Sequence, residues 1–464
     1  MPKALQANFH KYMVLLHKHL TFVVSLIFLF LTSMLAVSQK KLPDYSKQLF
    51  DKHEDFKERS LVNRRFKHKD IAPLVEALPF EVQKIGQSFE QRTIYQIKLG
   101  TGKIKILLWS QMHGDEPTAT MALMDIFKFF QVGGTPLGGT PQKNDGFDEL
   151  RKKILEKCTL YFVPMLNPDG AERYQRRTAT DIDMNRDALR FQTPEGQILK
   201  QLQDEIKPEF SFNLHDKGTK YSAGASGNQA TVSFLATSYD FEKSWNPTRT
   251  QAMQVICGMY ETLQQFIPNN LGRWNDDHEP RAFGDNIAKW GSSLILIESG
   301  GYKDDIEKQF IRKLNFVAIL AGLQAISEKS YRKHKLKTYE SIPNNDKYLF
   351  DLLIRNAEFA QNGKTIIKDI GINLSEKNIK NATDFEYSSV VEDIGDLSTF
   401  WGIKEIDAKG LTVRPLRDFP EATRNLKISE REMLNTELNI NETSSFVLTK
   451  NNEVKYIILN GQIK

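Results

Sequence analysis

The chain has 464 residues, which at about 150 residues per domain is enough for about three domains, or for one large and one small domain. Hydrophobic residues make up 40% of it and charged residues 26%, an ordinary globular composition that excludes a disordered chain, a collagen-like repeat and a disulfide scaffold. The formal net charge of +5 is too small to indicate that the protein binds a polyanion, so we expect no nucleic acid partner. The two cysteines, Cys158 and Cys257, allow at most one disulfide and exclude a cysteine metal site.

Residues 1–38 have the pattern of an export signal. Three lysines precede an uncharged apolar run over residues 20–39, and the small residues Ala36 and Ser38 suit a signal-peptide cleavage site before Gln39. An uncleaved membrane anchor through residues 20–39 is the alternative, because about 20 apolar residues can span a bilayer. Under either interpretation we expect an exported protein, periplasmic or extracellular.

Residues 39–79 are mixed and rich in charge, so we expect a helix or a solvated lead-in with little chemistry. From Thr93 onward strand patterns alternate with helix patterns, which is typical of an α/β fold. The expected strands are 103–111, 158–166, 210–215 and 292–299, the expected helix is 117–131, and the Gly- and Pro-rich segment 133–141 is an expected loop. We therefore predict a mostly parallel or mixed central sheet, covered by helices, over residues 80–330.

The remainder of the chain has a different pattern. Residues 331–346 are basic and then polar, which predicts a linker. Residues 347–464 contain strand-like pieces at 365–374 and 444–463, the second being a hairpin about Asn451-Asn452. We expect a small β-rich C-terminal module without a catalytic constellation.

His113 and Glu116 are the first candidate site residues, because they lie between the expected strand at 103–111 and the helix that follows it. Imidazole and carboxylate both bind zinc at about 2.0–2.2 Å, and a tight turn at Gly114 can bring the two together. A solvated turn, with Glu116 as a favourable charge at the helix N-terminus, explains the same residues. His215 favours the metal site, because it ends another apolar strand, where open α/β sheets place ligands. The three side chains form a His₂Glu set that leaves a fourth zinc position for water.

Glu298 ends the apolar strand at 292–299. A carboxylate there is costly unless it is paired or used, because desolvation opposes its charge. It is therefore a candidate general base that takes a proton from a metal-activated water and delivers it to a leaving amine. A salt-bridged glutamate at the strand end is the alternative.

The block from Asn167 to Asp187 adds polar groups of another kind. It begins with a turn, Asn167-Pro168-Asp169-Gly170, and contains the adjacent Arg176 and Arg177 and the run Asp183-Met184-Asn185-Arg186. An arginine and an asparagine near zinc would bind a carboxylate, because guanidinium binds that group bidentately.

The ordered set of His113-x-x-Glu116, NPDG, Asp183-x-Asn185-Arg186, His215 and Glu298 resembles the zinc carboxypeptidases of the M14 type, in a bacterial-type exported form. The resemblance covers about residues 80–330 and not the C-terminal module. It implies one zinc ion held by His113, Glu116 and His215, with Glu298 as the base. It also implies that Arg176 polarises the scissile carbonyl, that Asn185 and Arg186 bind the terminal carboxylate, and that Asp183 orients the first zinc histidine.

One family feature has no aligned counterpart. Phe283 stands at the position expected for the tyrosine that covers the substrate in this family, and Tyr221 and Tyr239 are unaligned. The expected function is an exported zinc metallocarboxypeptidase that cuts an amide bond next to a free C-terminal carboxylate, acting on a peptide or an acyl-amino acid. The missing tyrosine leaves a cell-wall peptide amidase or deacylase as one alternative, and a non-catalytic peptide-binding protein is the other.

Overall fold

The computed structural model describes residues 44–131, 145–423 and 438–464. The expected export signal at 1–38, its alternative as an anchor at 20–39 and the expected loop at 133–141 lie outside the described residues. Residues 44–464 belong to one compact unit.

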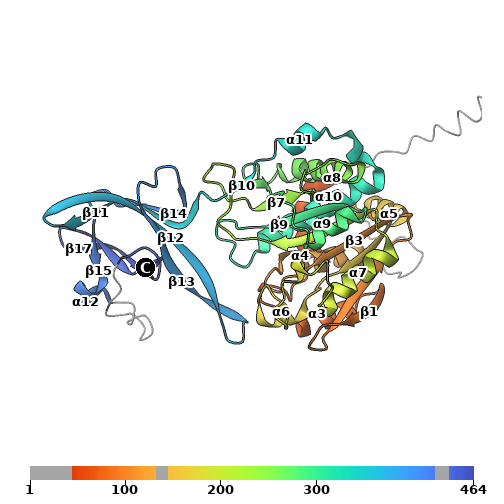
Figure 1. The fold of residues 1–464 in the computed structure, drawn as a ribbon, viewed down its shortest axis with the longest axis horizontal. Helices are drawn as coiled ribbons and strands as arrows, with labels where there is room; N and C mark the ends of the chain where they lie inside the picture. The colour runs from red at the N-terminus through yellow and green to blue at the C-terminus, as the bar shows by residue number, and fades with distance from the viewer. Residues whose placement is uncertain (1–43, 132–144, 424–437) are drawn as a thin grey trace, which may run out of the picture. The chain divides into compact units, whose positions relative to one another are not determined.

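A mixed sheet of eight strands occupies the centre of the region upstream of residue 330 (Figure 1). Its four central strands run parallel, in the order β4 (Cys158–Val163), β3 (Ile104–Ser110), β5 (Phe210–Asp216) and β9 (Ser293–Ser299). Antiparallel contacts add β2 (Thr93–Leu99) and β1 (Glu81–Gln87) on one side. On the other side β7 (Val232–Leu235) pairs with β9, and β8 (Leu271–Arg273) pairs with β7. The predicted fold class and its four strands are confirmed.

Helices cover both faces of this sheet (Figure 1). They are α4 (Thr118–Gln131), α5 (Asp148–Lys157), α7 (Pro194–Ile206), α8 (Pro247–Leu263), α9 (Phe283–Lys289) and α10 (Gln309–Glu328). Successive strand residues point to opposite faces, so Phe212 lies against α10 at Gly322 while Asn213 lies against α9 at Gly284. Within the described ranges α10 alone is long and apolar enough to cross a membrane, and it is mostly buried against α4 and α8. Its apolar character is therefore that of a core helix.

The N-terminal segment is partly helical from Ser46 onward, one of the two forms expected for residues 39–79, and it is packed instead of being a solvated lead-in. It forms α2 (Ser46–Asp51), the 3-10 turn η1 (His53–Asp55) and α3 (His68–Glu76), and Phe56 is buried. The fully buried Arg312 pairs with Asp125 and donates to the carbonyl of Glu58 at 2.9 Å. Buried charges require partners, so these contacts tie the segment to the helical layer.

The expected linker, residues 331–346, is packed against the rest of the chain. These residues form the 3-10 turn η3 (Ser330–Lys333), helix α11 (Leu336–Glu340) and strand β10 (Asn345–Asp346), which pairs with β6 (Ser222–Ala223). The buried Tyr339 accepts a hydrogen bond from the backbone N–H of Ala236 at 3.0 Å. The proposed domain boundaries stay predictions.

The β-rich C-terminal module is confirmed. Its strands are β11 (Leu349–Gln361), β12 (Lys364–Ile379), β13 (Asp384–Gly395), β14 (Trp401–Asp407), β15 (Thr412–Pro415), β16 (Phe446–Lys450), β17 (Glu453–Leu459) and β18 (Gln462–Ile463), and η4 (Leu416–Asp418) and α12 (Pro420–Thr423) follow β15. The predicted hairpin turns at Asn451 and Asn452, both with positive φ, as a tight β16–β17 turn requires. Cys158 and Cys257 are buried and free, so the disulfide that the sequence allowed does not form.

Candidate metal centre and active site

The turn that carries His113 and Glu116 lies between β3 and α4, as the sequence predicted. It packs against the Asn167–Gly170 turn, which begins α6 (Pro168–Arg173). Asn167 accepts a hydrogen bond from the N–H of Gly170 at 2.8 Å and donates to the carbonyl of Met112 at 3.2 Å. A Cβ on Gly114 would lie 1.9 Å from the carbonyl carbon of Gly170, so only glycine fits there. The NPDG motif therefore supports the backbone beside the first histidine.

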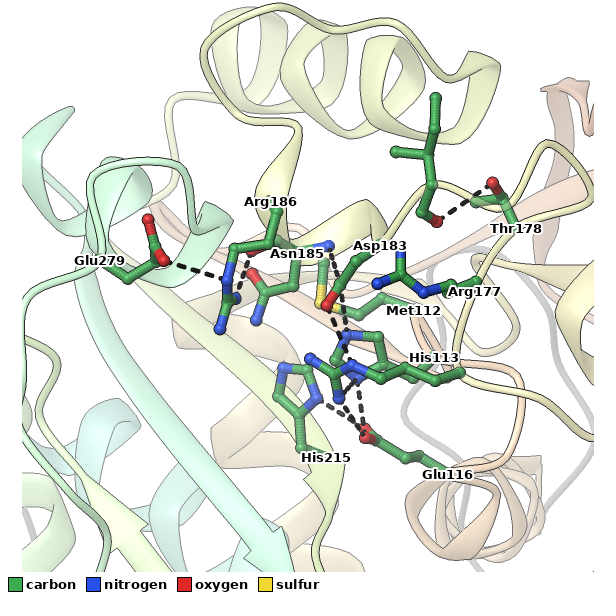
Figure 2. Close-up of polar contacts among 12 residues, drawn as sticks. Met112, His113, Glu116, Arg177, Thr178, Asp183, Asn185, Arg186, His215 and Glu279 are labelled. Carbon is green, nitrogen blue, oxygen red and sulfur yellow. Dashed lines mark hydrogen bonds and ion pairs between the residues drawn. The ribbon is translucent and has the colours of Figure 1, made fainter.

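His113, Glu116 and His215 offer three ligand atoms that lie within 4.8 Å of one another, and all three residues are buried (Figure 2). One oxygen of Glu116 lies 2.7 Å from His113 Nδ1 and the other lies 2.6 Å from His215 Nδ1. Two imidazoles and a carboxylate that converge from a turn and a strand end match the donor set of a zinc site with one open position. The chemistry and spacing of these side chains therefore fit zinc.

Burial and neighbouring charges raise the pKa of one member of this cluster and lower the pKa of the other two. Burial disfavours the charged ring of His113, but the carboxylates of Glu116 and Asp183 outweigh it and raise the pKa of His113 to about 9. Burial lowers the pKa of His215. Although burial opposes its charge, the two histidines hold the pKa of Glu116 well below its ordinary value. The centre thus keeps an anionic carboxylate between the two rings, which favours a cation.

Asp183 links the cluster to Arg176. Its Oδ1 lies 3.2 Å from His113 Nε2, and its Oδ2 accepts from Arg176 Nε at 3.0 Å. A carboxylate on the outer nitrogen of a metal histidine sets the orientation and tautomer of that ring. Arg176 Nη1 reaches to 3.1 Å from His113 Nδ1, whereas Arg177 turns away and donates to the carbonyl of Asp181. Arg176, the arginine that the resemblance singled out, therefore lies beside the cluster, and the side chain of Arg177 bonds elsewhere.

Glu298 lies beside His215, because the register of β5 and β9 pairs these two residues. The side chain is buried, and its Oε2 has no hydrogen-bond partner among the residues that the structure describes. Burial, followed by the charge of Glu116, raises the pKa of Glu298 well above its ordinary value, and Lys217 opposes that shift. A carboxyl group of this kind is suited to accept and release a proton.

Asn185 and Arg186 lie in the 3-10 turn η2 (Met184–Arg186). The amide oxygen of Asn185 accepts from the N–H of Phe283 at 2.9 Å, which anchors the turn to the start of α9. Arg186 Nε lies 3.1 Å from a carboxylate oxygen of Glu279 (Figure 2). Arg186 is partly exposed and lines the same cleft as the histidines. Its guanidinium can therefore reach an incoming carboxylate.

Comparison with known proteins connects this geometry to a family. Residues 75–249 match the model of the family described as zinc carboxypeptidase, peptidase M14. This stretch is similar to the zinc carboxypeptidases. The match includes the three candidate zinc ligands, Arg176, Asp183, Asn185 and Arg186, and it ends before Glu298.

The curated proteins that this chain matches are distant. Carboxypeptidase 2 of Trichophyton rubrum is 26% identical over 114 residues, which are 25% of this chain and 19% of that protein. Carboxypeptidase 2 of Trichophyton tonsurans is 25% identical over 119 residues, which are 26% of this chain and 20% of that protein. The chain thus spans about a fifth of the length of these relatives. Among solved structures, a metallo-carboxypeptidase from Burkholderia cenocepacia aligns with a TM-score of 0.46 and 16% identity, over 57% of this chain and 70% of that one.

Two residues of the cleft beside the metal cluster, Lys217 and Tyr302, were not expected from the sequence. The cleft has a volume of about 1030 Å³, and Lys217, Trp274 and Tyr302 line it. Tyr221 also lines it and packs edge-on against Trp274, with 4.9 Å between ring centroids. Phe283 is fully buried and contributes its backbone to Asn185 instead of a side chain to the cleft. The sequence does not show which residues line the cleft, because that depends on which strand ends and loops the fold brings together.

Proposed function

We propose that this protein is an exported carboxypeptidase that uses one zinc ion to hydrolyse the amide bond next to a free C-terminal carboxylate of a peptide or acyl-amino acid. The observation that carries the proposal is the convergence of His113, Glu116 and His215 within 4.8 Å, with Glu298 on the adjoining strand. The match to the zinc carboxypeptidase family supports it. Export is inferred from the pattern of residues 1–38.

The residues around the cluster have separate tasks in this reaction. A zinc ion bound by His113, Glu116 and His215 would supply Lewis acidity toward the scissile carbonyl and lower the pKa of a water molecule. Glu298, buried next to His215, accepts the proton of the attacking water and gives it to the leaving amine. Arg176, held by Asp183, stabilises the negative charge that develops on the carbonyl oxygen.

Arg186 determines which amide bond of the substrate is hydrolysed. In this proposal it binds the terminal carboxylate together with Asn185, which places the last amide bond over the metal cluster. Both residues lie in η2, directly after Asp183, so the carboxylate site and the support of the first histidine belong to one turn.

The full chain tests the proposal with a matched pair of substrates. We expect hydrolysis of an acylated dipeptide with a free C-terminus, loss of hydrolysis with a chelator and its return on addition of zinc. The same dipeptide with an amidated C-terminus should not be cut. Cleavage of both substrates at similar rates would favour the amidase or deacylase, which the position of Phe283 leaves open. Peptide binding by a protein that takes up no zinc would favour the non-catalytic alternative.

A further inference from the structure

The loop that carries Arg176 begins where α6 ends. The end of that helix is hydrogen-bonded by side chains from other parts of the chain. A helix terminus leaves carbonyl groups without partners in the helix. Tyr174, the residue after α6, has a φ of 46°, which a residue with a side chain adopts only when its surroundings hold it there. Contacts of α6 and Tyr174 therefore determine the path of the backbone from Tyr174 to Arg176.

Lys67 supplies the first of these contacts. Its buried ammonium donates to the carbonyls of Ala171 at 3.5 Å and of Glu172, both in the last turn of α6. It also donates to the carbonyl of Ala382 at 3.1 Å, in the turn between β12 and β13 of the C-terminal module. One side chain thus joins the end of α6 to the module, and burial lowers its pKa.

The module supplies the next contacts directly. Asn378, on β12, donates to the carbonyls of Arg173 at 3.0 Å and of Tyr174 at 3.1 Å. It also accepts from Arg65 Nη1 at 2.6 Å. Asn378 therefore caps the end of α6 with an amide from a strand about 200 residues later in the chain, as its separation from Tyr174 shows.

Glu376, two residues earlier on β12, holds two buried arginines. It accepts from Arg64 Nη2 and, at 2.6 Å, from Arg65 Nη2. Arg64 Nη1 donates to the hydroxyl of Tyr174 at 3.1 Å, and the guanidinium of Arg65 lies 3.8 Å from the centre of the Tyr174 ring. The ring and the backbone carbonyl of Tyr174 are thus both fixed by groups that the module holds.

We propose that Glu376 and Asn378 of the C-terminal module are positioning residues for Arg176, acting through Tyr174. Arg176 follows Tyr174 by two residues, and its side chain must meet both Asp183 and the edge of His113. A misplacement of about 1 Å at a reacting group can reduce a rate about 100-fold. The effect on turnover rests on the proposed carboxypeptidase activity, whereas the order of the loop does not.

The test compares the full-length double variant Glu376→Gln/Asn378→Ala with Asn373→Ala. Asn373 is a matched control, because it lies on the same strand and its side chain donates to Glu392 within the module. Hydrogen exchange over residues 170–180 is the first measurement, and two of its reporters are the N–H groups of Gln175, bonded to Gly170, and Thr178, bonded to Ile182. We expect faster exchange there in the double variant, with the rest of the catalytic region unchanged, and wild-type exchange in the control.

Turnover is the second measurement. We expect kcat to fall about 10-fold in the double variant, with zinc content and KM within about twofold of wild type, and no change in the control. Unchanged exchange at residues 170–180 would overturn the positioning role. A rise in KM with kcat unchanged would also overturn it, because that result would make the module a substrate-binding wall. If the wild-type protein cuts no peptide, the proposed function fails and the exchange comparison still decides the coupling.

Discussion

His215 and Glu298 are cross-strand partners on the parallel strands β5 and β9. This register places a buried carboxylate next to a candidate metal ligand without any local sequence motif that joins the two. Their separation in the chain is large, yet the sheet makes them neighbours at the ends of their strands, where α/β sheets place ligands.

Glu298→Gln isolates the proton-transfer role. The amide keeps the size of the side chain but cannot accept a proton, so we expect kcat to fall by about 100- to 10,000-fold while zinc content stays at the wild-type value. Steady-state kinetics with elemental analysis check this. Glu209→Gln is the control, because Glu209 is exposed and precedes the opposite end of β5. Turnover close to wild type in a zinc-loaded Glu298→Gln protein would remove Glu298 as the base.

Zinc should stabilise the folded protein through the three ligands. A ligand that binds only the native state at 100 times its Kd adds about 2.7 kcal/mol to the free energy of unfolding. We expect the Tm of the wild type to rise with zinc and fall with a chelator. His113→Ala and His215→Ala should show neither response, whereas His334→Ala, which lies beside Glu261, should behave as wild type. A zinc-dependent Tm in His215→Ala would contradict the ligand set.

Asp183→Asn should weaken zinc binding without removing a ligand. The carboxylate of Asp183 contacts both His113 and Arg176, and such outer partners change metal affinity or activity by about 10- to 100-fold. Titration of zinc against a competing chelator measures the change. Asp181→Asn is the control, because Asp181 is exposed and its φ of 64° suits asparagine. Equal zinc affinity and activity in the two variants would show that Asp183 has no supporting role.

Arg186→Met should affect substrates according to their C-terminus. Loss of a hydrogen-bonded charge is worth about 1.5–3 kcal/mol, so we expect KM for a free C-terminus to rise about 10- to 100-fold. The preference for free over amidated substrates should shrink by the same factor. Arg190→Met is the control, because Arg190 is exposed. An unchanged preference in Arg186→Met would place the carboxylate site elsewhere.

Glu195 should make stability depend on pH. Burial, followed by the charges of Asp169 and Asp187, raises its pKa to about 7 from the ordinary 4.5. The folded protein therefore keeps a proton that the unfolded chain releases, so the free energy of unfolding falls as pH rises from 4.5 to 7. The loss totals roughly 3 kcal/mol at one pKa unit per 1.36 kcal/mol.

Glu195→Gln removes this dependence. We expect the variant to be more stable than wild type at pH 8 and similar to it at pH 4.5, by chemical denaturation at both pH values. Glu205→Gln, at an exposed position of the same helix, should match the wild type throughout. Identical denaturation midpoints of Glu195→Gln and wild type at pH 8 would contradict the raised pKa.

The sequence by itself determined the α/β class, the strands that end at His215 and Glu298, and the set of polar residues at the candidate site. Those features follow from local patterns, because strand periodicity, apolar runs and a three-residue spacing each span only a few consecutive residues. The hairpin at Asn451-Asn452 could be predicted for the same reason, since its turn conformation is local.

Only the tertiary structure decided how those residues are supported. The charge of residues 39–79 left a helix and a solvated lead-in both open, and it did not indicate that Arg64 and Arg65 are buried against Glu376, more than 300 positions away. The use of Phe283 for its backbone and the pairing of Arg186 with Glu279 were likewise decided in space. Buried charges and helix ends take whichever partners packing brings within hydrogen-bond distance, and no local pattern records that distance.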